Sequence, residues 1–434
     1  MSFVIVLGFV LLIAFMVMGL PVIYSFGVCV FIMLMGLGYD FSFICTTAYA
    51  RTASYTLLCV PLFILAGGII EKGKMGGHLI DFINKFVGRF RCALSYVSII
   101  TCGVFGALTG SAAATAASIG SILTPQLKRA GYKPGFIGAL FANASILGLL
   151  IPPSTLMIVI AWSTGLSVLA CFLCTLLPGI VLIIFLCIVS TFMNRKNTEL
   201  KVSEPMTPKA WAVDLGHKTR EAFPVLLLPV IILGGIYGGL MTPTESAAVG
   251  ALYAILIALL VYRSMSLREL KDTLVTSGTT AGVIMMSMFM VGVVSKVLTY
   301  AGLPDLIVKA VDSMNANKYV VMLFINVILI IMGMLMDDTC VVLISAPLFF
   351  PLAKQLGFDP YHFAAIMGVN MGMATLTPPS APSLYTCSRI CDAPVGEMLL
   401  PDFQFLLFAW IPTLILTIVF PQLSLTLPHL IGVG

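Results

Sequence analysis

The sequence predicts an all-α polytopic membrane protein that is built from two repeats of inverted topology. Of the 434 residues, 60% are hydrophobic and 9% are charged, whereas about a quarter of a soluble domain is charged. The apolar runs supply about a dozen spans at roughly 20 residues each. A segment of the first half also matches a segment of the second half without gaps. These three observations exclude a soluble globular protein and a simple membrane anchor.

The first half, residues 1–192, is predicted to be the first repeat. Its N-terminal run lacks the basic start and the small-residue cleavage site of a secretory signal, so we expect a retained helix there. The stretch 76–91 is amphipathic, with leucine, isoleucine and phenylalanine on one side and basic residues on the other, which suits a helix in the cytoplasmic interface. In chain order the expected elements are helices near 3–20, 21–38 and 55–71, the amphipathic stretch, a hairpin at 92–129, a broken helix at 134–162 and a helix at 168–192.

A polar interval at 193–222 separates the two halves. It is interpreted as a cytoplasmic linker, because about 30 residues bury too little surface to fold alone. The second repeat follows at 223–434, and within it Glu245 is expected to begin a helix that Thr242 or Thr244 caps. The expected elements of this half are runs at 223–240, 246–262 and 275–298, a hairpin at 319–354, a broken helix at 360–388 and a run at 404–431.

The two predicted hairpins differ from plain spanning helices in length and in composition. Each apolar stretch holds about 35 residues, long enough to cross the bilayer twice. Each also carries small or polar residues near its middle, Thr109-Gly110-Ser111 in one and Asp337-Asp338-Thr339 in the other. We therefore expect each to enter and leave the membrane on the same side, with a tip at membrane depth.

The distribution of basic residues supports this topology. With the N-terminus outside and both stretches re-entrant, 18 of the 23 basic residues fall in cytoplasmic segments, as the positive-inside rule requires. The five that remain outside are Arg51, Lys296, Lys309, Lys318 and Lys354. The sequence thus predicts a periplasmic N-terminus and a cytoplasmic central linker.

An internal repeat is the most informative feature of the chain. At an offset of 226 positions, nine of the 30 residue pairs between 125–154 and 351–380 are identical. The run Pro152-Pro153-Ser154 matches Pro378-Pro379-Ser380, and Ser111 of the first tip falls on Asp337 of the second. Five spans and one hairpin per half make an odd number of crossings, so the copies are expected to face opposite ways. Inverted repeats with discontinuous helices are the architecture of many secondary transporters.

The duplicated prolines predict two helix breaks. Proline lacks a backbone N–H and clashes with the carbonyl one turn earlier, so 150–154 and 376–380 are expected to leave carbonyl groups without helical partners. Such carbonyls are tolerated at membrane depth only where they are buried in protein or line a cavity. Together with a hairpin tip, each break would form an oxygen cage suited to a dehydrated monovalent cation. The alternative is that each break is an ordinary, structurally absorbed kink.

Seven motifs occur in a fixed order along the chain. They are Gly106–Gly120 (GALTGSAAATAASIG), Gly131-Tyr132, Gly148–Ser154 (GLLIPPS), Pro178-Gly179, Thr242–Ala248 (TPTESAA), Gly333–Asp337 (GMLMD) and Thr377–Pro379 (TPP). In this order they resemble the motifs of the large membrane subunit (DctM type) of tripartite ATP-independent periplasmic (TRAP) transporters. The resemblance covers essentially the whole chain.

The resemblance implies a sodium-driven uptake system in the bacterial inner membrane. It implies that an extracytoplasmic binding protein (DctP type) delivers an acidic organic solute, such as a carboxylate, sugar acid or sulfonate, to this subunit and a small four-helix subunit (DctQ type). It also implies an elevator-type architecture, in which the hairpins and broken helices move against a scaffold. The coupling ion that the resemblance implies is sodium, with two or more ions per transport cycle. No other cofactor and no nucleic-acid partner is expected, and the chain has no phosphate-binding loop for ATP hydrolysis.

Candidate ligands gather at the hairpin tips and the breaks. Ser111 offers a hydroxyl and Gly110 a carbonyl for sodium, although small residues there also suit close helix packing. A charge near the bilayer centre costs about 2.5–3.5 kcal/mol, so Asp337 and Asp338 are interpreted as functional; Asp337 also suits a helix cap. The predicted sodium ligands are Gly110, Ser111, Gly148, Ile151 and Pro153 at the first hairpin and break, and Gly333, Asp337, Asp338, Thr339, Ala374 and Thr377 at the second. The predicted substrate ligands are Asn143, Ser145, Ser154, Asn370 and Ser380.

Three departures from the family pattern surround the second site. Ala374 stands where the family usually has glycine, Ser380-Ala381 replaces another glycine, and Cys340 replaces a frequent proline. The alternative within transporters is a stand-alone sodium/carboxylate symporter of related architecture. A membrane enzyme that uses Asp337 and Asp338 with a divalent metal is disfavoured, because no third carboxylate or histidine has ligand spacing nearby. A channel is disfavoured by the paired hairpins, and we expect no enzymatic activity.

Overall fold

The computed structural model describes residues 2–88, 92–195, 197, 208–313, 316–379 and 381–432, and all regular structure in them is helical. Six helical segments of these residues are long and apolar enough to cross a membrane. A seventh is the broken pair Pro134–Leu150 and Thr155–Thr164, whose two parts meet at 43°. The predicted class, an all-α polytopic membrane protein, is therefore confirmed.

The first half contains the expected elements and one further helix. That helix, α3, is not an apolar run, because threonines and an arginine interrupt its hydrophobic residues, and a search for hydrophobic stretches alone does not find it. The helices are α1 (Ser2–Val17), α2 (Val22–Leu37), α3 (Ser42–Thr52), α4 (Cys59–Lys72), α5 (Gly76–Val87), α6 (Ala93–Thr109), α7 (Ala112–Thr115), α8 (Ser121–Arg129), α9 (Pro134–Ser145), α10 (Leu147–Leu150), α11 (Thr155–Thr164) and α12 (Val168–Asn194). A π-helical turn at Ala116–Gly120 joins α7 to α8.

The second half differs from expectation in the starts of three helices, in one helix that was not predicted and in its final run. Helix α15 begins at Leu267 and α21 at Val395, ahead of the expected 275 and 404. Helix α13 begins at Pro208, so it extends into the interval 193–222 that was predicted as a linker. The amphipathic helix α16 lacks a continuous apolar run and was not predicted. The final run is divided at Phe420-Pro421. The helices are α13 (Pro208–Tyr237), α14 (Pro243–Leu256), α15 (Leu267–Tyr300), α16 (Leu303–Ser313), α17 (Lys318–Gly333), α18 (Asp338–Gln355), α19 (Pro360–Ala374), α20 (Pro382–Cys391), α21 (Val395–Phe405), α22 (Ile411–Val419) and α23 (Gln422–Leu430). A π-helical turn at Leu406–Trp410 joins α21 to α22.

The start of α14 is an N-terminal capping box. The Thr242 hydroxyl accepts a hydrogen bond from the Glu245 backbone N–H at 3.3 Å, and the Glu245 carboxylate accepts one from the Thr242 N–H at 2.8 Å. Each side chain thus satisfies a backbone donor that the first helical turn leaves unpaired. The structural interpretation of Glu245, with Thr242 as the cap, is confirmed.

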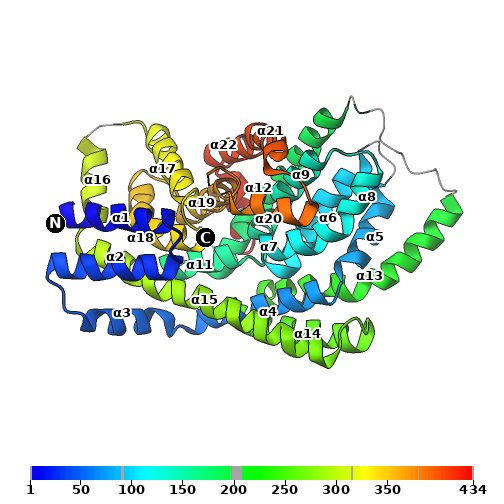
Figure 1. Ribbon diagram of the computed structural model, residues 1–434, viewed down its shortest axis with the longest axis horizontal. Helices are drawn as coiled ribbons and strands as arrows, with labels where there is room; N and C mark the ends of the chain where they lie inside the picture. The colour runs from blue at the N-terminus through cyan, green and yellow to red at the C-terminus, as the bar shows by residue number, and fades with distance from the viewer. Residues whose placement is uncertain are drawn as a thin grey trace.

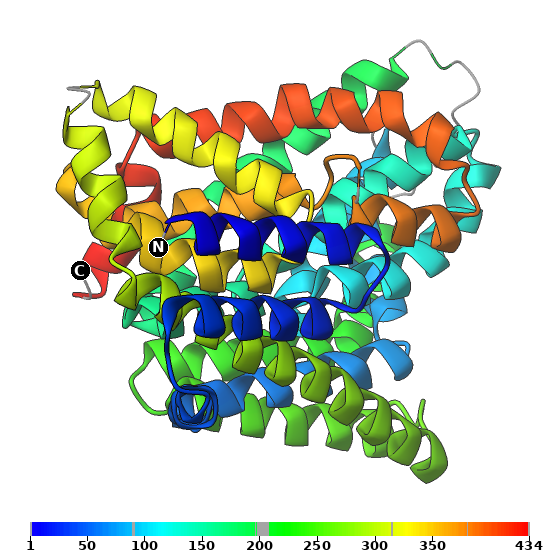
Figure 2. The same cartoon turned by 60° about the vertical axis from the view of Figure 1, so that its left-hand side comes forward.

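Two groups of helices form the body of the protein. In one group, α4 packs against α14 and α15, and α15 also packs against α2 and α3. Figure 1 shows α3, α4, α14 and α15 along the lower side of the molecule, and they keep this place in Figure 2. The other group holds the two hairpins, which lie toward opposite ends of the long axis, with α11, α12, α19 and α20 between them (Figure 1).

The two halves interlock at their broken helices. Helix α11, which follows the first break, packs against α18 of the second hairpin. Helix α20, which follows the second break, packs against α9 and against the π-helical turn of the first hairpin. A β-carbon added at Gly120 in that turn would lie 3.1 Å from the Ile390 side chain of α20. Each broken helix therefore contacts the hairpin of the other half.

The amphipathic helix α5 is bound to α13 by polar contacts. Its buried face carries Leu79, Ile80 and Ile83. On its polar face, Lys85 forms an ion pair with Asp214 of α13, and Asp81 pairs with Lys218 at 2.9 Å. These bonds hold the helix that leads into the first hairpin against the first helix of the second half.

Candidate functional site

The turn of the first hairpin is built by a glycine and a serine. Helix α6 ends at Gly110, which adopts the left-handed conformation with φ of +61°, a region that L side chains rarely enter. Ser111 is extended, and its hydroxyl accepts the Ala114 N–H at 3.4 Å, which caps the next helix. The Thr115 hydroxyl donates to the Ser111 carbonyl at 2.7 Å. The hairpin therefore presents carbonyl and hydroxyl oxygens at its tip.

This tip lies directly on the first break. The Thr155 hydroxyl donates to the Gly110 carbonyl at 3.0 Å. A β-carbon on Gly110 would lie 2.9 Å from the Pro153 carbonyl oxygen, and one on Gly148 would lie 3.3 Å from the Ser111 carbonyl oxygen. The structure thus brings together Gly110, Ser111, Gly148 and Pro153, which the sequence grouped as candidate sodium ligands.

The helices behind the tip approach each other through glycine. A β-carbon added at Gly106 of α6 would lie 2.4 Å from the Gly148 Cα atom. A side chain at Gly106 would therefore force the two backbones apart, and a β-carbon at Gly148 would lie 3.1 Å from the Gly106 Cα atom. The fifth predicted ligand, Ile151, is half-buried at the break, and its side chain lies 3.1 Å from the place that a Gly103 β-carbon would occupy.

The first break leaves backbone oxygens that a regular helix would pair. Pro152 and Pro153 have no N–H to donate to the carbonyls of Gly148 and Leu149, four residues earlier. The Ser154 hydroxyl replaces one of these donors, since it bonds the Leu149 carbonyl at 2.6 Å. Ser154 also caps α11 by accepting the Met157 N–H at 3.4 Å. Its hydroxyl is fully buried and used by the backbone on both sides of the break.

The second hairpin turns at Met334–Asp337 and uses acids in place of the serine. The Asp337 carboxylate caps α18 by accepting the Cys340 N–H at 3.2 Å, and the Asp338 carboxylate accepts the Thr339 N–H at 2.9 Å. The capping role expected for Asp337 is confirmed. The Asp337 side chain is exposed, whereas Asp338 and Thr339 are half-buried. Asp337 therefore leaves carboxylate oxygen accessible beside the tip.

The second break differs from the first in three contacts. A β-carbon on Gly333 would lie 2.4 Å from the Ala374 Cβ, so the alanine fills the place of a second glycine. The Thr377 hydroxyl, just beyond the end of α19, bonds the Met373 carbonyl at 3.0 Å. Ala381, which the repeat aligns with Thr155, has no hydroxyl and adopts a φ of +28°. Ser380 lies outside the described residues.

Asn143 belongs to a buried network between α9 and α21. Its amide nitrogen donates to the Asp402 carboxylate at 2.7 Å and to the Ala139 carbonyl at 2.9 Å. Its amide oxygen accepts the Trp410 indole N–H at 2.9 Å. The Trp410 ring occupies the space that Gly372 leaves free on α19, since a β-carbon there would lie 2.6 Å from the ring. Trp410 thus contacts both broken helices, which lie far apart in the sequence.

The other predicted substrate ligands are also buried between helices. The Asn370 amide nitrogen donates to the Asn326 side chain at 2.7 Å and to its carbonyl at 3.1 Å, which ties α19 to α17. The Ser145 hydroxyl bonds the Ala142 carbonyl at 3.2 Å. Both residues have no exposed surface. The structure therefore places Asn143 and Asn370 in contacts between helices, whereas the Ser145 hydroxyl bonds within α9.

Three residues of these contacts were missed by the sequence interpretation. Thr155 follows Pro-Pro-Ser directly, but the aligned residue is Ala381, so the comparison of the two halves carried no signal for it. Asp402 is an acid inside the span Val395–Val419, and an ionisable group at such a place is a functional candidate by default. Trp410 carried no signal, because an apolar run conceals which aromatic ring finds a buried acceptor.

The chain matches a known family over nearly its whole length. The family model described as "Tripartite ATP-independent periplasmic transporter, DctM component" matches residues 9–423. The C4-dicarboxylate TRAP transporter large permease protein DctM of Pseudomonas aeruginosa is 36% identical over 386 residues, which cover 89% of this chain and 89% of that protein. The sialic acid TRAP transporter large permease protein SiaM of Vibrio cholerae is 32% identical over 382 residues, which cover 88% of each.

A solved transporter structure shares the fold. The structure of Neisseria gonorrhoeae MtrF, which belongs to a class of antimetabolite efflux pumps, aligns with a TM-score of 0.62 over 86% of this chain and 83% of its own. The sequence identity is 14%, so the likeness concerns the fold alone.

Replacing Gly110 with alanine is expected to destabilise the protein more than the matched substitution Gly165→Ala. Both glycines have a left-handed φ, of +61° and +74°, where a β-carbon costs about 1–2 kcal/mol. Only at Gly110 would the β-carbon also clash with the Pro153 carbonyl, because Gly165 has no neighbouring atom within 4 Å. Thermal unfolding of the purified variants measures the difference. Equal losses would contradict the contact between tip and break.

Replacing Trp410 with phenylalanine tests the link between the broken helices. The ring is retained, but the buried Asn143 oxygen loses its donor, which is expected to cost about 1–3 kcal/mol. Trp211→Phe is the control, because its N–H bonds the Lys85 carbonyl at a partly buried place where water can substitute. Thermal unfolding should show a larger loss of stability for Trp410→Phe than for Trp211→Phe. A smaller loss for Trp410→Phe would mean that the bond to Asn143 does not help to hold the two broken helices together.

Proposed function

The chain belongs to the DctM component family of tripartite ATP-independent periplasmic transporters, and from this premise we propose that it is the large permease subunit that carries an acidic organic solute inward with sodium ions. Its partners in this proposal are a small four-helix membrane subunit and an extracytoplasmic binding protein that delivers the solute. The membrane is the bacterial inner membrane, with the N-terminus on the periplasmic side.

The contact between the first hairpin tip and the first break carries the proposal. The Gly110, Ser111 and Pro153 carbonyls meet there with the Ser111, Thr115 and Thr155 hydroxyls. Uncharged oxygens of this kind suit a monovalent cation, whereas calcium sites depend on several carboxylates. The Gly110 carbonyl and the carbonyls at the proline break supply these oxygens at membrane depth, where unpaired backbone groups are tolerated only if they are buried in protein or line a cavity. We assign the first sodium ion to this cage.

A second sodium ion is assigned to the second tip and break. Asp337, which the repeat aligns with Ser111, caps α18 and still has exposed carboxylate oxygen. Gly333, Asp338, Thr339, Ala374 and Thr377 complete the proposed set. The second set includes two carboxylates, whereas the first cage has only uncharged oxygens, so the two sodium ions would be bound in different electrostatic surroundings. Two sodium ions with a monoanion carry one net positive charge inward, which yields about 2.3 kcal/mol per 100 mV.

The solute site is proposed between the two tips. Helices α11 and α18 begin there, and helix N-termini attract anions through their free N–H groups and dipoles. Two bound cations would add to this attraction. The relatives named for C4-dicarboxylate and sialic acid both act on carboxylic acids. For Asn143 and Asn370 we propose positioning roles, because their amides bond neighbouring helices. For Ser145 we propose a role in the geometry of α9 itself, because its hydroxyl bonds the Ala142 carbonyl of the same helix.

The mechanism proposed is an elevator. The hairpins with α9–α12 and α19–α22 form the moving part, and the layer of α3, α4, α14 and α15 forms the scaffold. The backbone at Thr109 lies against Gly67 of α4, where a β-carbon would approach the Thr109 carbonyl to 3.0 Å. A glycine at that contact lets the tip slide past the scaffold helix without a side chain in its path.

Reconstitution in liposomes tests this function. The chain is inserted with its small subunit, and uptake of a radiolabelled C4-dicarboxylate or sialic acid is measured with its cognate binding protein outside. Uptake is expected only with an inward sodium gradient, and an inside-negative potential should increase it. Equal uptake without the gradient would reject sodium coupling. Equal uptake without the binding protein would reject the tripartite assignment and favour a stand-alone symporter.

Ser111→Ala and Asp337→Ala are expected to weaken the dependence of uptake on sodium. Loss of one ligand should raise the sodium concentration for half-maximal uptake about tenfold, which corresponds to about 1.4 kcal/mol. Ser121→Ala, also in the first hairpin, and Asp305→Asn, an exposed acid of α16, are matched controls that should leave the sodium titration unchanged. Wild-type sodium titrations for both site variants would remove these residues from the sodium sites.

A further inference from the structure

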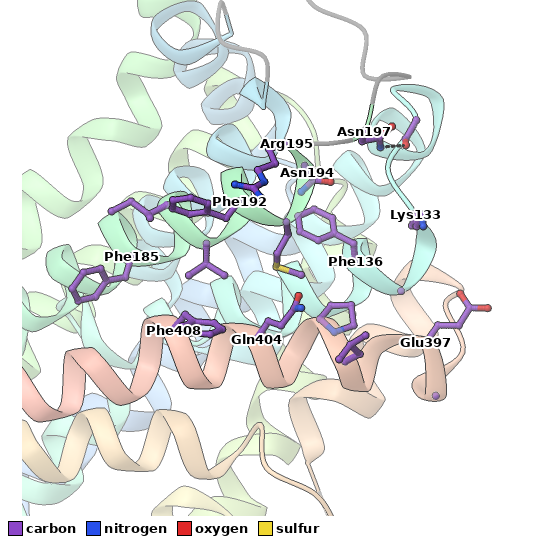
Figure 3. A pocket seen from close by; sticks show the side chains of 18 residues that line it. Lys133, Phe136, Phe185, Phe192, Asn194, Arg195, Asn197, Glu397, Gln404 and Phe408 are labelled. Carbon is purple, nitrogen blue, oxygen red and sulfur yellow. Dashed lines mark hydrogen bonds between the residues drawn. The ribbon is translucent and has the colours of Figure 1, made fainter.

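A long surface groove lies outside the proposed transport site. It has a volume of about 1460 Å³ and runs between α12 and α21, with the first turn of α9 at one end. Figure 3 shows Lys133 and Glu397 at one end of this groove, Phe185 and Phe408 toward the other, and Arg195 along the edge between them, beside Phe192. The groove is therefore divided into a charged end and an apolar length.

The apolar length is formed by one face of each of two helices. Phe185, Ile188 and Phe192 recur on α12 at spacings of three and four residues, and Leu400 and Phe408 lie on the facing side of α21 and the turn that follows it. Phe192 is 63% exposed and Leu400 is 68% exposed. Both helices are candidate membrane spans, so these side chains present an apolar surface at membrane depth.

The charged end carries more positive than negative charge. Lys133 and Arg195 are both exposed, and within the described residues neither has a carboxylate within salt-bridge distance. Lys133 immediately precedes α9, whose unpaired N–H groups and dipole add to the positive potential. Glu397 is held beside this turn, because a β-carbon on Gly135 would lie 2.3 Å from its carbonyl oxygen. Two cations and one carboxylate leave one formal positive charge.

We propose that this groove binds an anionic phospholipid, with its phosphodiester between Lys133 and Arg195 and its acyl chains along α12 and α21. A small acidic solute would use the charged end but leave the apolar length uncovered. A neutral lipid would use the apolar length but leave the net charge unbalanced. The headgroup of phosphatidylglycerol has one negative charge and hydroxyl donors, which match the two cations and the Glu397 carboxylate.

The position of the groove agrees with this occupant. The basic residues 128, 129, 133 and 195 lie on the side that the positive-inside distribution predicts to be cytoplasmic. Anionic lipids give the cytoplasmic leaflet a negative surface potential, which attracts basic side chains near the membrane. A lipid here would contact α9, α12 and α21 at once, and the bond between Asn143 and Asp402 joins two of these helices, α9 and α21.

The test measures lipid binding to the full chain in detergent by native mass spectrometry, with phosphatidylglycerol and phosphatidylcholine as probes. Wild type is expected to retain phosphatidylglycerol in preference. The double variant Lys133→Gln/Arg195→Gln should reduce that binding about tenfold, and Lys133→Arg/Arg195→Lys should preserve it. The control Lys309→Gln/Lys354→Gln removes the same charge from exposed positions elsewhere and should bind as wild type does.

Three results would overturn the proposal. One is equal retention of the two lipids by wild type. Another is an equal loss of phosphatidylglycerol in the site variant and in the control variant, which would mean that only overall charge matters. The third is complete displacement of the lipid by inorganic phosphate, which would identify a site for free anions without a contribution from the acyl chains. Thermal unfolding of each variant verifies that the fold is intact.

Discussion

The structure depends on the need to satisfy backbone carbonyl groups inside a membrane. Pro152 and Pro153 remove two donors from a buried helix, and lipid offers no water to replace them. The Ser154 hydroxyl donates to the Leu149 carbonyl in place of one missing donor, and the hairpin tip lies directly against the break. Tip and break are therefore one structural unit, joined by the Thr155–Gly110 hydrogen bond.

The two units are similar in order but different in chemistry. At the first, Thr155 bonds the Gly110 carbonyl and a pair of glycines brings the backbones together. At the second, Ala381 has no hydroxyl, Ala374 fills the place of a glycine, and an exposed carboxylate replaces Ser111. The packing is reciprocal, with α11 on the second hairpin and α20 on the first, so each unit contacts the hairpin of the other half. Trp410, between Asn143 and Gly372, strengthens that connection.

Much of the fold was predictable from the sequence, because membrane helices are recognisable as long hydrophobic runs. The breaks were predictable because proline acts locally, and the tips because glycine and aspartate are out of place in an apolar run. Helices α3 and α16 were missed, since amphipathic or mixed helices leave no continuous apolar stretch. The start of α13 was missed because a polar composition is compatible with helix as well as with linker.

The sequence by itself determined that the chain is a membrane protein, where its helices break, and that each half has the same order of parts. These properties follow from local chemistry, namely apolar run length, proline and the spacing of polar residues. Only the tertiary structure decided which polar groups meet. It placed Thr155 on the first tip and Asn143 with Asp402 and Trp410, because contacts across 45, 259 and 267 positions of sequence depend on how the helices pack. Periodicity and composition along one helix carry no information about the partner that the neighbouring helix supplies.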